Sequence, residues 1–572
     1  MAMKKKVLVL DGDMTPALTV ARSLARAGLH VDIASHIDKP LAGYSRHTRL
    51  QLGYPNPLES PQLFIDWLKA HAANDTYELV IPVTERTAVP IHRQRDQISD
   101  INVALPEHDS LEVALDKAKT VELALQLGIP VPESRSISQN NRHPYDENML
   151  PYPVVIKPAR SMGAEDKGII QLSVDYAFDH AELTAKTTHA LRFGDVILQA
   201  YFKGQGVGVE LITDHGKIIY AFQHLRLHEV PLTGGGSSLR KSVAVEPELL
   251  AASQKLMASL NWHGVAMVEF KWNPETRDFR LMEINGRFWG SLPLAVSAGA
   301  DFPAMLYELL SQGHVTQRPP ARLGMYGQKI SSDLYWYEQV MRRNAPEKLV
   351  TLPTSSSLLR DALLIFSPRH RFDIQQWGDP LPGLIDLWQI AANYIDRIRQ
   401  LLSARVFAWR QRRAWSDGEI GTRLRTAGHI LFVCYGNINR SALAGNYFST
   451  KTAGMAIASE SAGFHAQAGR PADPNMTELA KTKGINLEAQ RSRSLDHAMV
   501  GTADLIFVME KKHYDKIAMD YPAATNKTFL LSPCGEIDDP YGKSTAVYKH
   551  CLDEVTNSVD TLTMLLFKAK NT

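Results

Sequence analysis

A cysteine and an arginine with five residues between them stand in the segment VCYGNINRSA (433–442). Cys434 ends the apolar run HILFVC, and Arg440 comes just before the helix-like stretch SALAGNYF. A short loop between a strand and a helix start lets successive backbone N–H groups converge on one phosphate. Those donors would also favour the thiolate of Cys434. Arg440 can bind phosphate oxygens through two N–H groups, and Ser441 is placed to donate a hydrogen bond to the sulfur. The chemistry indicated is attack by Cys434 on a phosphate ester.

The alternative is an inert packing cysteine at the end of a buried strand. Three later segments argue against it. SAGFHAQAGRPADP, from Ser461, is typical of a second strand with its exit loop, QRSRSL precedes the apolar strand ADLIFVMEKKH, and EIDDPYG places Asp539 directly before Pro540. In this order the segments resemble the low-molecular-weight protein tyrosine phosphatases, from about Gly428 to the C-terminus. The resemblance implies a flavodoxin-like α/β domain with a central parallel sheet.

The same resemblance implies roles for individual residues. It makes Cys434 the nucleophile, and Arg440 the group that binds the phosphate and the transition state. Asp539 would be the general acid that protonates the leaving oxygen and later activates water. Asn437 would hold the shape of the loop, and Ser441 would stabilise the thiolate. The expected substrate is a phosphotyrosine protein or a phosphorylated small molecule.

Some positions of the loop depart from the family pattern. Many members carry a second cysteine just before the arginine, which traps the oxidised nucleophile as a disulfide. Here this residue is Asn439, so oxidised Cys434 should lack that rescue. The family's proline after the Arg-Ser pair is Ala442, which we expect a helix start to tolerate. Ile438 resembles the phosphotyrosine-specific members, since those that act on phosphoarginine tend to have threonine there.

Short apolar strands alternate with helix-like stretches over the first hundred residues, as in KVLVLDGD, TPALTVARSLARAG, HVDIAS and YELVIPVTE. This rhythm predicts a parallel, doubly wound sheet. No G-x-G-x-x-G is present there, so we expect a scaffold and not a dinucleotide site. Further along, Lys117 opens a helix that ends at Gly128, with Pro130 as a stop signal. Lys157 lies on the strand of PYPVVIKPARSMG, which leads into a glycine-containing loop.

Two acidic residues are predicted to meet on a hairpin. VAMVEFKW alternates as a strand and carries Glu269, and FRLMEINGR carries Glu283 and Asn285 on one face of a second strand. The turn NPETRD joins the two strands and brings the carboxylates together. Oxygen ligands of this kind suit Mg²⁺ that carries nucleotide phosphates, and buried acids so close would repel each other without a cation between them. The alternative is a chance acidic pair on a solvated face.

Together these segments resemble the ATP-grasp superfamily, over roughly Lys4 to Pro319. The resemblance assigns the metal, Mg²⁺ with Mn²⁺ also possible, to Glu269, Glu283 and Asn285, and phosphate or acyl-phosphate binding to Arg287. ATP would bind in contact with a further set: Lys117, Lys157, Gln199, Tyr201 and Phe202. Many members have a glutamate after the position of Gln199, where this chain has Ala200. The expected reaction joins a small-molecule carboxylate to an acceptor nucleophile.

HLRLHEVPLTGGGSSLRKS (224–242) is predicted to form a flexible, cationic loop. It carries three glycines together with Arg226 and Arg240. Functionally it could fold over the acyl acceptor or the phosphate tail, and Arg226 is the candidate substrate or phosphate ligand. The alternative is a mobile hairpin tip without a role in binding.

The whole chain of 572 residues is long enough for several domains, with 44% hydrophobic residues and a formal net charge of +2. No global charge favours nucleic acid, no stretch approaches a membrane span, and three cysteines fit a reducing cytoplasm. We predict a Rossmann-like domain before the ATP-grasp domain (1–108), the ATP-grasp domain (109–327), a helical connector (328–427) and the phosphatase domain (428–572). The connector contains a long helix with an apolar stripe, interpreted as a strut; a helix at a membrane surface is the alternative.

The sequence therefore predicts an α/β multidomain, cytoplasmic enzyme with two activities. One is an ATP- and Mg²⁺-dependent, ADP-forming ATP-grasp ligase, and the other a cysteine-dependent tyrosine phosphatase. Two alternatives remain open. The ATP-grasp half could be a kinase whose product the phosphatase hydrolyses, or it could bind nucleotide without turnover and regulate the phosphatase.

Overall fold

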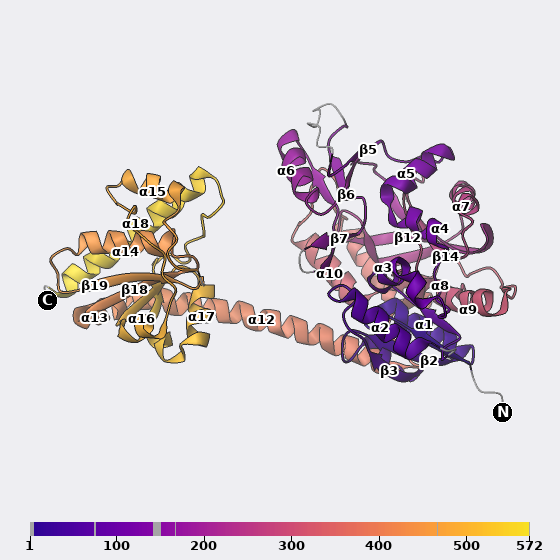
Figure 1. Cartoon of the computed structure of the whole chain (residues 1–572), viewed down its shortest axis with the longest axis horizontal. Helices are drawn as coiled ribbons and strands as arrows, with labels where there is room; N and C mark the ends of the chain where they lie inside the picture. The colour runs from indigo at the N-terminus through magenta and orange to yellow at the C-terminus, as the bar shows by residue number, and fades with distance from the viewer. Residues whose placement is uncertain (1–4, 74–75, 141–149, 166–167, 466, 571–572) are drawn as a thin grey trace. The chain divides into compact units, whose positions relative to one another are not determined.

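The computed structural model describes residues 5–73, 76–140, 150–165, 168–465 and 467–570. The chain divides into two compact units, residues 1–391 and 392–572 (Figure 1). The expected α/β multidomain class is confirmed, since each unit contains a parallel sheet flanked by helices. In the described part of the chain, no helix combines the length and apolar character that a membrane crossing requires.

The first sheet of unit 1 has the strand order β3-β2-β1-β4, with all strands parallel. Its strands are β1 (Lys6–Val9), β2 (His30–Ser35), β3 (Thr48–Gly53) and β4 (Leu79–Ile81), and its helices α1 (Thr15–Arg26), α2 (Pro61–Ala72) and α3 (Glu85–Arg93). Side chains alternate along β1, so Val7 and Val9 pack with α1 while Leu8 packs with α2. The sheet is therefore covered on both faces, as the alternating sequence predicts.

An antiparallel sheet follows, in the order β5-β10-β6-β9. It consists of β5 (Ser134–Ile137), β6 (Val154–Pro158), β9 (Asp175–Ala177) and β10 (Val196–Ala200), with α6 (His180–Ala190) against it. α4 (His108–Leu115) and α5 (Lys117–Gln126) precede the sheet, and a small hairpin of β7 (Met162–Glu165) and β8 (Gly168–Gln171) lies within it in sequence. Asp116 caps α5, accepting from the N–H groups of Ala118 and Lys119. The cap fixes where Lys117 begins the helix.

The largest sheet runs in the order β15-β14-β11-β12-β13-β16-β17. Its strands are β11 (Gln205–Asp214), β12 (Lys217–Val230), β13 (Gly236–Val243), β14 (Gly264–Trp272), β15 (Phe279–Asn285), β16 (Tyr326–Gln328) and β17 (His370–Phe372). The surrounding helices are α7 (Pro247–Ser259), α8 (Leu292–Ala298), α9 (Phe302–Gln312), α10 (Ile330–Met341) and α11 (Ser355–Leu363). Because β17 pairs with β16, the range predicted as a connector contributes a strand to this sheet.

Two further helices complete the range 328–427. α12 (Pro380–Ser416) carries the apolar stripe read from the sequence and crosses the division between the units, and α13 (Glu419–Thr426) follows it. Arg22 and Asp379 form a buried ion pair at 2.8 Å, which anchors the segment before α12 to α1.

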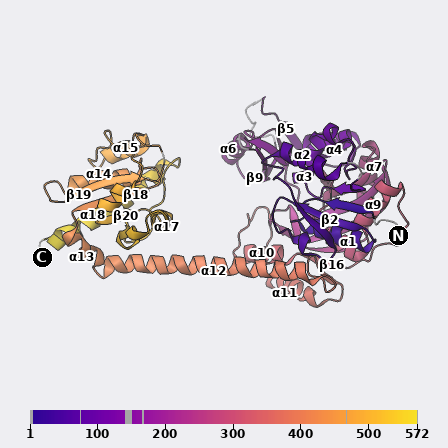
Figure 2. The same ribbon diagram turned by 60° about the horizontal axis from the view of Figure 1, so that its bottom comes forward.

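Unit 2 contains a parallel sheet in the order β19-β18-β20-β21 (Figure 2). Its strands are β18 (His429–Cys434), β19 (Ala458–Gly463), β20 (Leu505–Val508) and β21 (Thr528–Leu530), and its helices α14 (Arg440–Lys451), α15 (Pro474–Lys481), α16 (His497–Thr502), α17 (Lys511–Asp520) and α18 (Thr545–Lys570). Phe432 and Cys434 of β18 face a core formed with α14, α15 and α18, whereas Leu431 and Val433 face a second core with α16 and α17. The carboxyl end of β18 thus places Cys434 at the edge of the sheet.

Candidate functional sites

The loop 435–439 joins the end of β18 to the start of α14 and surrounds the thiol of Cys434. The Ser441 hydroxyl lies 3.0 Å from Cys434 Sγ, and the backbone N–H of Asn437 donates to the sulfur at 3.3 Å. Cys434 itself is buried. The thiol is therefore held among hydrogen-bond donors at the start of a helix, as the spacing of the segment predicts.

Asn437 ties this loop to neighbouring segments. Its backbone has φ of 51°, a left-handed conformation that asparagine tolerates better than most residues. Its side-chain Nδ2 donates to the hydroxyls of Ser441 and Ser461, each at 3.0 Å, and its Oδ1 accepts from the N–H of Arg493 at 2.9 Å. Asn437 thus holds the loop, the helix start and β19 in one arrangement.

Gly463, the last residue of β19, lies directly beneath the loop. A Cβ atom built at this position would lie 2.6 Å from the carbonyl oxygen of Tyr435 and 2.9 Å from the backbone nitrogen of Asn437. Backbone atoms cannot move aside without changing the loop. The close approach therefore requires glycine.

Arg440 is buried and contacts two carboxylates. Its Nη2 lies 2.8 Å from Asp539 Oδ2, and its Nη1 pairs with Glu510 and donates to the Ile537 carbonyl at 2.8 Å. Burial acts to lower the pKa of Arg440, but the charges of Cys434, Glu510 and Asp539 outweigh it and raise the pKa. The guanidinium thus stays a cation at the start of α14, after the loop that the sequence predicts to bind phosphate.

Glu510 and His513 also belong to this site, although the sequence reasoning did not single them out. Glu510 follows β20 at the carboxyl edge of the sheet, and an acid in that place is the signal that could have identified it. His513 is buried beside it, and neither ring nitrogen has a hydrogen-bond partner. Burial and the charge of Arg440 lower the pKa of His513 to about 4.

In unit 1, the predicted acidic hairpin is formed by β14 and β15, with Glu269 and Glu283 directly paired. Asn285 Nδ2 donates to both carboxylates, at 3.1 and 3.2 Å. Arg226, on β12 at the other side of β11, lies 2.5 Å from Glu269. The two acids and the amide therefore share one site, and an arginine already neutralises one of the acids.

All the residues predicted to bind ATP line a cavity of about 150 Å³. Its lining includes Lys117, Lys157, Gln199, Tyr201, Phe202, Arg226, Glu269 and Glu283. Lys271, which the sequence reasoning missed, also lines it and pairs with Glu229 at 2.8 Å. Its position two residues after Glu269, on the same face of β14, could have identified it.

Charges in this cavity act on one another. Burial lowers the pKa of Lys157 to about 8, and the charge of Lys117 acts in the same direction. Burial acts to raise the pKa of Glu283, but Lys117, Lys157 and the hydrogen bond from Asn285 outweigh it, so the pKa is lowered. Burial raises the pKa of Glu269 despite the nearby Arg226. Glu283 is therefore the carboxylate that stays most firmly ionised.

The segment 199–202, which the resemblance assigns to ATP, lines the cavity. Gln199 is buried, and its amide nitrogen Nε2 donates to the Ser134 hydroxyl at 3.0 Å. Tyr201 donates to the Leu349 carbonyl at 2.9 Å. The Phe202 ring lies 4.9 Å from the Arg280 guanidinium. The segment thus borders the cavity, and its side chains also contact other parts of the unit.

Asn285 and Arg287 line a second, small cavity of about 20 Å³, which shares Lys117 and Glu283 with the first. Arg287 lies 3.1 Å from Glu85, at the start of α3. Lys117 donates to the Ser161 hydroxyl at 2.9 Å. The first sheet thus contributes an acid to this site through α3, which is more than the scaffold role expected of it.

The loop predicted at 224–242 is mostly strand. β12 continues to Val230 and β13 begins at Gly236, so only residues 231–235 form a loop. Arg226 lines the cavity, whereas Arg240 is buried against Asp373, away from it. The prediction of a loop rested on the three glycines, whereas the alternation of HLRLHEV is typical of a strand.

The residues present fit a magnesium ion bound with nucleotide phosphates. Two buried carboxylates in register supply oxygen ligands of the kind that Mg²⁺ prefers. Asn285 presents its amide nitrogen to them, and rotation of the amide would present its oxygen to a cation. Lys117 and Lys157 provide the positive charge that phosphates require.

Comparison with known proteins identifies the C-terminal region. Residues 429–571 match the family model for low molecular weight phosphotyrosine protein phosphatase. The probable low molecular weight protein-tyrosine-phosphatase EpsP of Ralstonia nicotianae is 35% identical over 133 residues, 23% of this chain and 90% of that protein. A protein-arginine-phosphatase of Geobacillus stearothermophilus is 34% identical over 138 residues, 23% of this chain and 92% of that protein.

The N-terminal region has its own matches. Residues 192–332 match a family model described as ATP-grasp in the biosynthetic pathway with Ter operon. The crystal structure of an L-amino acid ligase from Bacillus licheniformis is 14% identical, covers 55% of this chain and 75% of that one, and has a TM-score of 0.42. Through residues 429–571 the chain belongs to the low molecular weight phosphotyrosine protein phosphatase family, and it carries an ATP-grasp domain before them.

Proposed function

We propose that the chain is a bifunctional enzyme. Its ATP-grasp half uses MgATP to activate a small-molecule carboxylate as an acyl-phosphate, releases ADP and passes the acyl group to an amine or another nucleophile. Its C-terminal half hydrolyses phosphate monoesters through Cys434. Both proposals rest on side chains that lie together in each unit, and each has a separate test.

For the phosphatase, the observation that carries the proposal is the position of Cys434 Sγ. It lies within hydrogen-bond reach of Ser441 and the Asn437 N–H, beside a buried Arg440. The thiolate attacks phosphorus, an S–P bond forms, and the P–O bond to the leaving group breaks. Asp539 gives its proton to the departing oxygen. Water, deprotonated by Asp539, then cleaves the S–P bond and releases inorganic phosphate.

Relatives of this domain include proteins named as tyrosine and arginine phosphatases. We propose phosphotyrosine as the substrate, because Ile438 stands in the loop where the resemblance associates threonine with phosphoarginine. Rates on a phosphotyrosine peptide and a phosphoarginine peptide of the same sequence test this. An Ile438→Thr variant should move the preference toward phosphoarginine. Faster wild-type hydrolysis of phosphoarginine would contradict the assignment.

For the ligase, the in-register pairing of Glu269 with Glu283 beside Lys117 and Lys157 carries the proposal. This arrangement supplies a metal site and phosphate-binding cations in one cavity. Bound Mg²⁺ would neutralise phosphate charge, and the chain's own residues would position the nucleotide. Arg287, paired with Glu85 in the neighbouring cavity, is placed to bind the carboxylate or the acyl-phosphate.

The decisive experiment is a substrate screen that measures ADP release with pairs of carboxylates and amines, with products identified by mass spectrometry. A ligase requires both substrates for full ADP release and yields a condensed product. The screen should be run with the Cys434→Ser variant in parallel. If a phosphorylated product accumulates in that variant in place of a condensed one, the ATP-grasp half is a kinase and the ligase proposal fails.

A further inference from the structure

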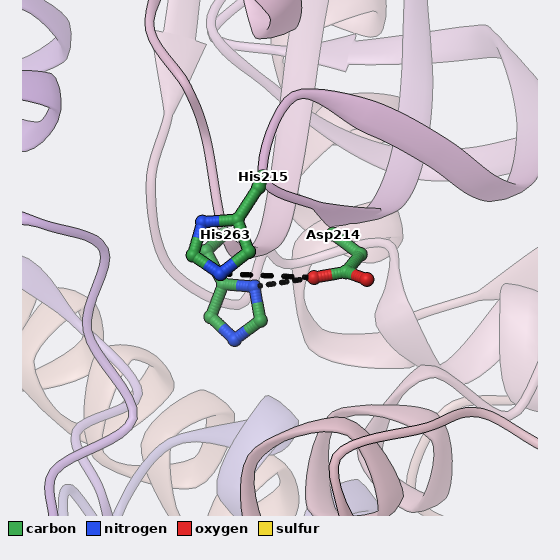
Figure 3. Close-up of side chains that lie close together, drawn as sticks. All are labelled: Asp214, His215 and His263. Carbon is green, nitrogen blue, oxygen red and sulfur yellow. Dashed lines mark ion pairs between the residues drawn. The ribbon is translucent and has the colours of Figure 1, made fainter.

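Three metal-binding side chains meet at one end of the β11–β14 pair, outside both sites described above. They are Asp214, His215 and His263, and their potential ligand atoms all lie within 4.8 Å of one another (Figure 3). The Asp214 carboxylate lies 3.2 Å from His263 Nδ1 and 3.9 Å from His215 Nε2. These separations are close to those of ligands that share one metal ion at about 2 Å from each.

The backbone brings the three residues together through two tight turns. β11 and β12 are joined by a two-residue turn, His215–Gly216, in which both residues have positive φ, 43° and 82°. This is the turn type in which Asn-Gly is favoured, so a histidine at its first position is an unusual choice. His263 lies in the turn just before β14, where Thr213 pairs with Gly264.

Hydrogen bonds hold the two turns against each other independently of the three side chains. The Thr213 hydroxyl donates to the Trp262 carbonyl at 2.9 Å, and the Gly216 N–H donates to the same carbonyl at 2.7 Å. Gln254 donates to the Gly216 carbonyl at 2.7 Å. The ligand atoms are therefore presented by a preformed backbone, which reduces the entropy lost when an ion binds.

The two imidazoles are close neighbours. The imidazoles of His215 and His263 stack at 4.5 Å with an interplanar angle of 20°. His263 Nδ1 is buried and has no hydrogen-bond partner of proper geometry. The side chains of His215 and Asp214 are exposed, which gives an ion access from solvent.

We propose that Asp214, His215 and His263 bind a divalent transition-metal ion that clamps the β11–β12 turn to the turn before β14. Two imidazoles and one carboxylate favour Zn²⁺, Co²⁺, Ni²⁺ or Cu²⁺ over Mg²⁺ and Ca²⁺, which prefer oxygen ligands alone. Three protein ligands leave a coordination position for water. The site is distinct from the one formed by Glu269, Glu283 and Asn285 because it uses nitrogen ligands and lies at the other end of β14.

The test uses full-length protein with its affinity tag removed, treated with chelator and freed of it by gel filtration. Co²⁺ is titrated and followed by visible absorption, which reports nitrogen-ligated Co²⁺ of low coordination number. The wild type should bind one equivalent with such a spectrum. His215→Ala, His263→Ala and Asp214→Asn should each lose it, and added Zn²⁺ should displace Co²⁺ from the wild type.

Two control variants test whether the Co²⁺ absorption comes from the proposed site. His314→Ala removes an exposed histidine of the same unit and should keep the spectrum, and Glu283→Gln should also keep it because that residue belongs to the other site. Zn²⁺ should raise the midpoint of thermal unfolding of the wild type but not of His215→Ala, since only the folded wild type presents the site. If the wild type shows no such spectrum, or if His215→Ala and Asp214→Asn retain it, the proposal is wrong.

Discussion

The Asp539 carboxylate lies 2.8 Å from the guanidinium of Arg440, so the proposed general acid is paired with the proposed phosphate-binding group. Glu510 holds the same guanidinium from a more buried position, since its side chain is 12% exposed against 40% for Asp539. A phosphate that binds to Arg440 should therefore displace Asp539 and leave Glu510 in place. That displacement frees Asp539 to reach the leaving group.

Asp539→Asn should slow hydrolysis most for substrates with poor leaving groups, by roughly a hundredfold or more, as expected when a general acid is lost. An activated aryl phosphate needs less protonation and should lose less. Rates on a phosphotyrosine peptide and on p-nitrophenyl phosphate measure the difference. Equal losses on both substrates would argue against the acid role and point to a disturbed Arg440.

Cys434→Ser should reduce turnover of p-nitrophenyl phosphate by roughly a thousandfold or more, since a serine hydroxyl here has no base to activate it. Phosphate binding should persist, because Arg440 and the loop N–H groups remain. Isothermal titration with phosphate and steady-state rates measure the two properties separately. Wild-type turnover in the serine variant would exclude Cys434 as the nucleophile.

Glu283→Gln should abolish ADP formation and spare phosphatase activity. It removes the carboxylate that Lys117, Lys157 and Asn285 keep ionised. Glu275→Gln, on the exposed turn of the same hairpin, is the matched control and should retain both activities. Parallel loss of both activities in Glu283→Gln would mean that the variant unfolds or that the halves depend on each other.

Unit 2 should lose stability in mild acid, because protonation of the buried His513 is unfavourable in the folded state. Its pKa falls from 6.5 to about 4 on folding, so the unfolded chain binds more protons between these values. Stability should be full above about pH 6.5 and decrease as pH falls to about 4, by roughly 2–3 kcal/mol in total.

His513→Gln removes the titrating group and should flatten this part of the pH profile, whereas the exposed His550→Gln should not. Urea unfolding at several pH values, monitored by pulsed hydrogen exchange of the amides in β18 and β20, measures how the free energy of unfolding of this unit depends on pH. If the free energy of unfolding of His513→Gln depends on pH as in the wild type, other groups cause the acid sensitivity.

Peroxide should inactivate the phosphatase irreversibly. Asn439 stands where the family commonly has a resolving cysteine, so Cys434 should pass from sulfenic acid to higher oxidation states. Cys551 is buried, and burial raises the pKa of its thiol to about 12, which leaves little thiolate to form a disulfide. Activity lost to peroxide should therefore return poorly with dithiothreitol.

Two comparisons sharpen this prediction. Asn439→Cys should improve recovery by supplying a partner inside the loop, and bound phosphate should protect both proteins by covering the sulfur. Full recovery of the wild type, with Cys434 mapped in a disulfide to Cys534 or Cys551, would show a resolving cysteine across the site.

Local periodicity predicted the elements that carry each site. The alternation of VAMVEFKW and FRLMEINGR, with the short turn between them, was enough to predict the pairing of Glu269 with Glu283. Contacts between distant segments were not predictable in this way. Glu85 reaches Arg287 from helix α3, which follows a strand of another sheet. Arg226 and Arg240 look alike in sequence, although only Arg226 lines the cavity.

Contacts between distant segments also explain why the sequence did not predict the cluster at His215 or the role of Glu510. His215 and His263 lie far apart in sequence, and only the pairing of β11 with β14 joins them. Glu510 contacts Arg440 because parallel strands end at one edge of the sheet. Such contacts follow from topology, which residue spacing along a single strand does not encode.

Because a Cβ atom does not fit at Gly463, a substitution at this position can be used in a genetic experiment. Gly463→Ala places a methyl group against the backbone of the loop 435–439 and leaves every reactive group in the sequence unchanged. A cell that carries this variant would keep the ATP-grasp half and all three cysteines, with only the shape of the loop altered. Its phenotype would show the effect of a distorted loop with the thiol still present, whereas a cysteine substitution removes the thiol itself.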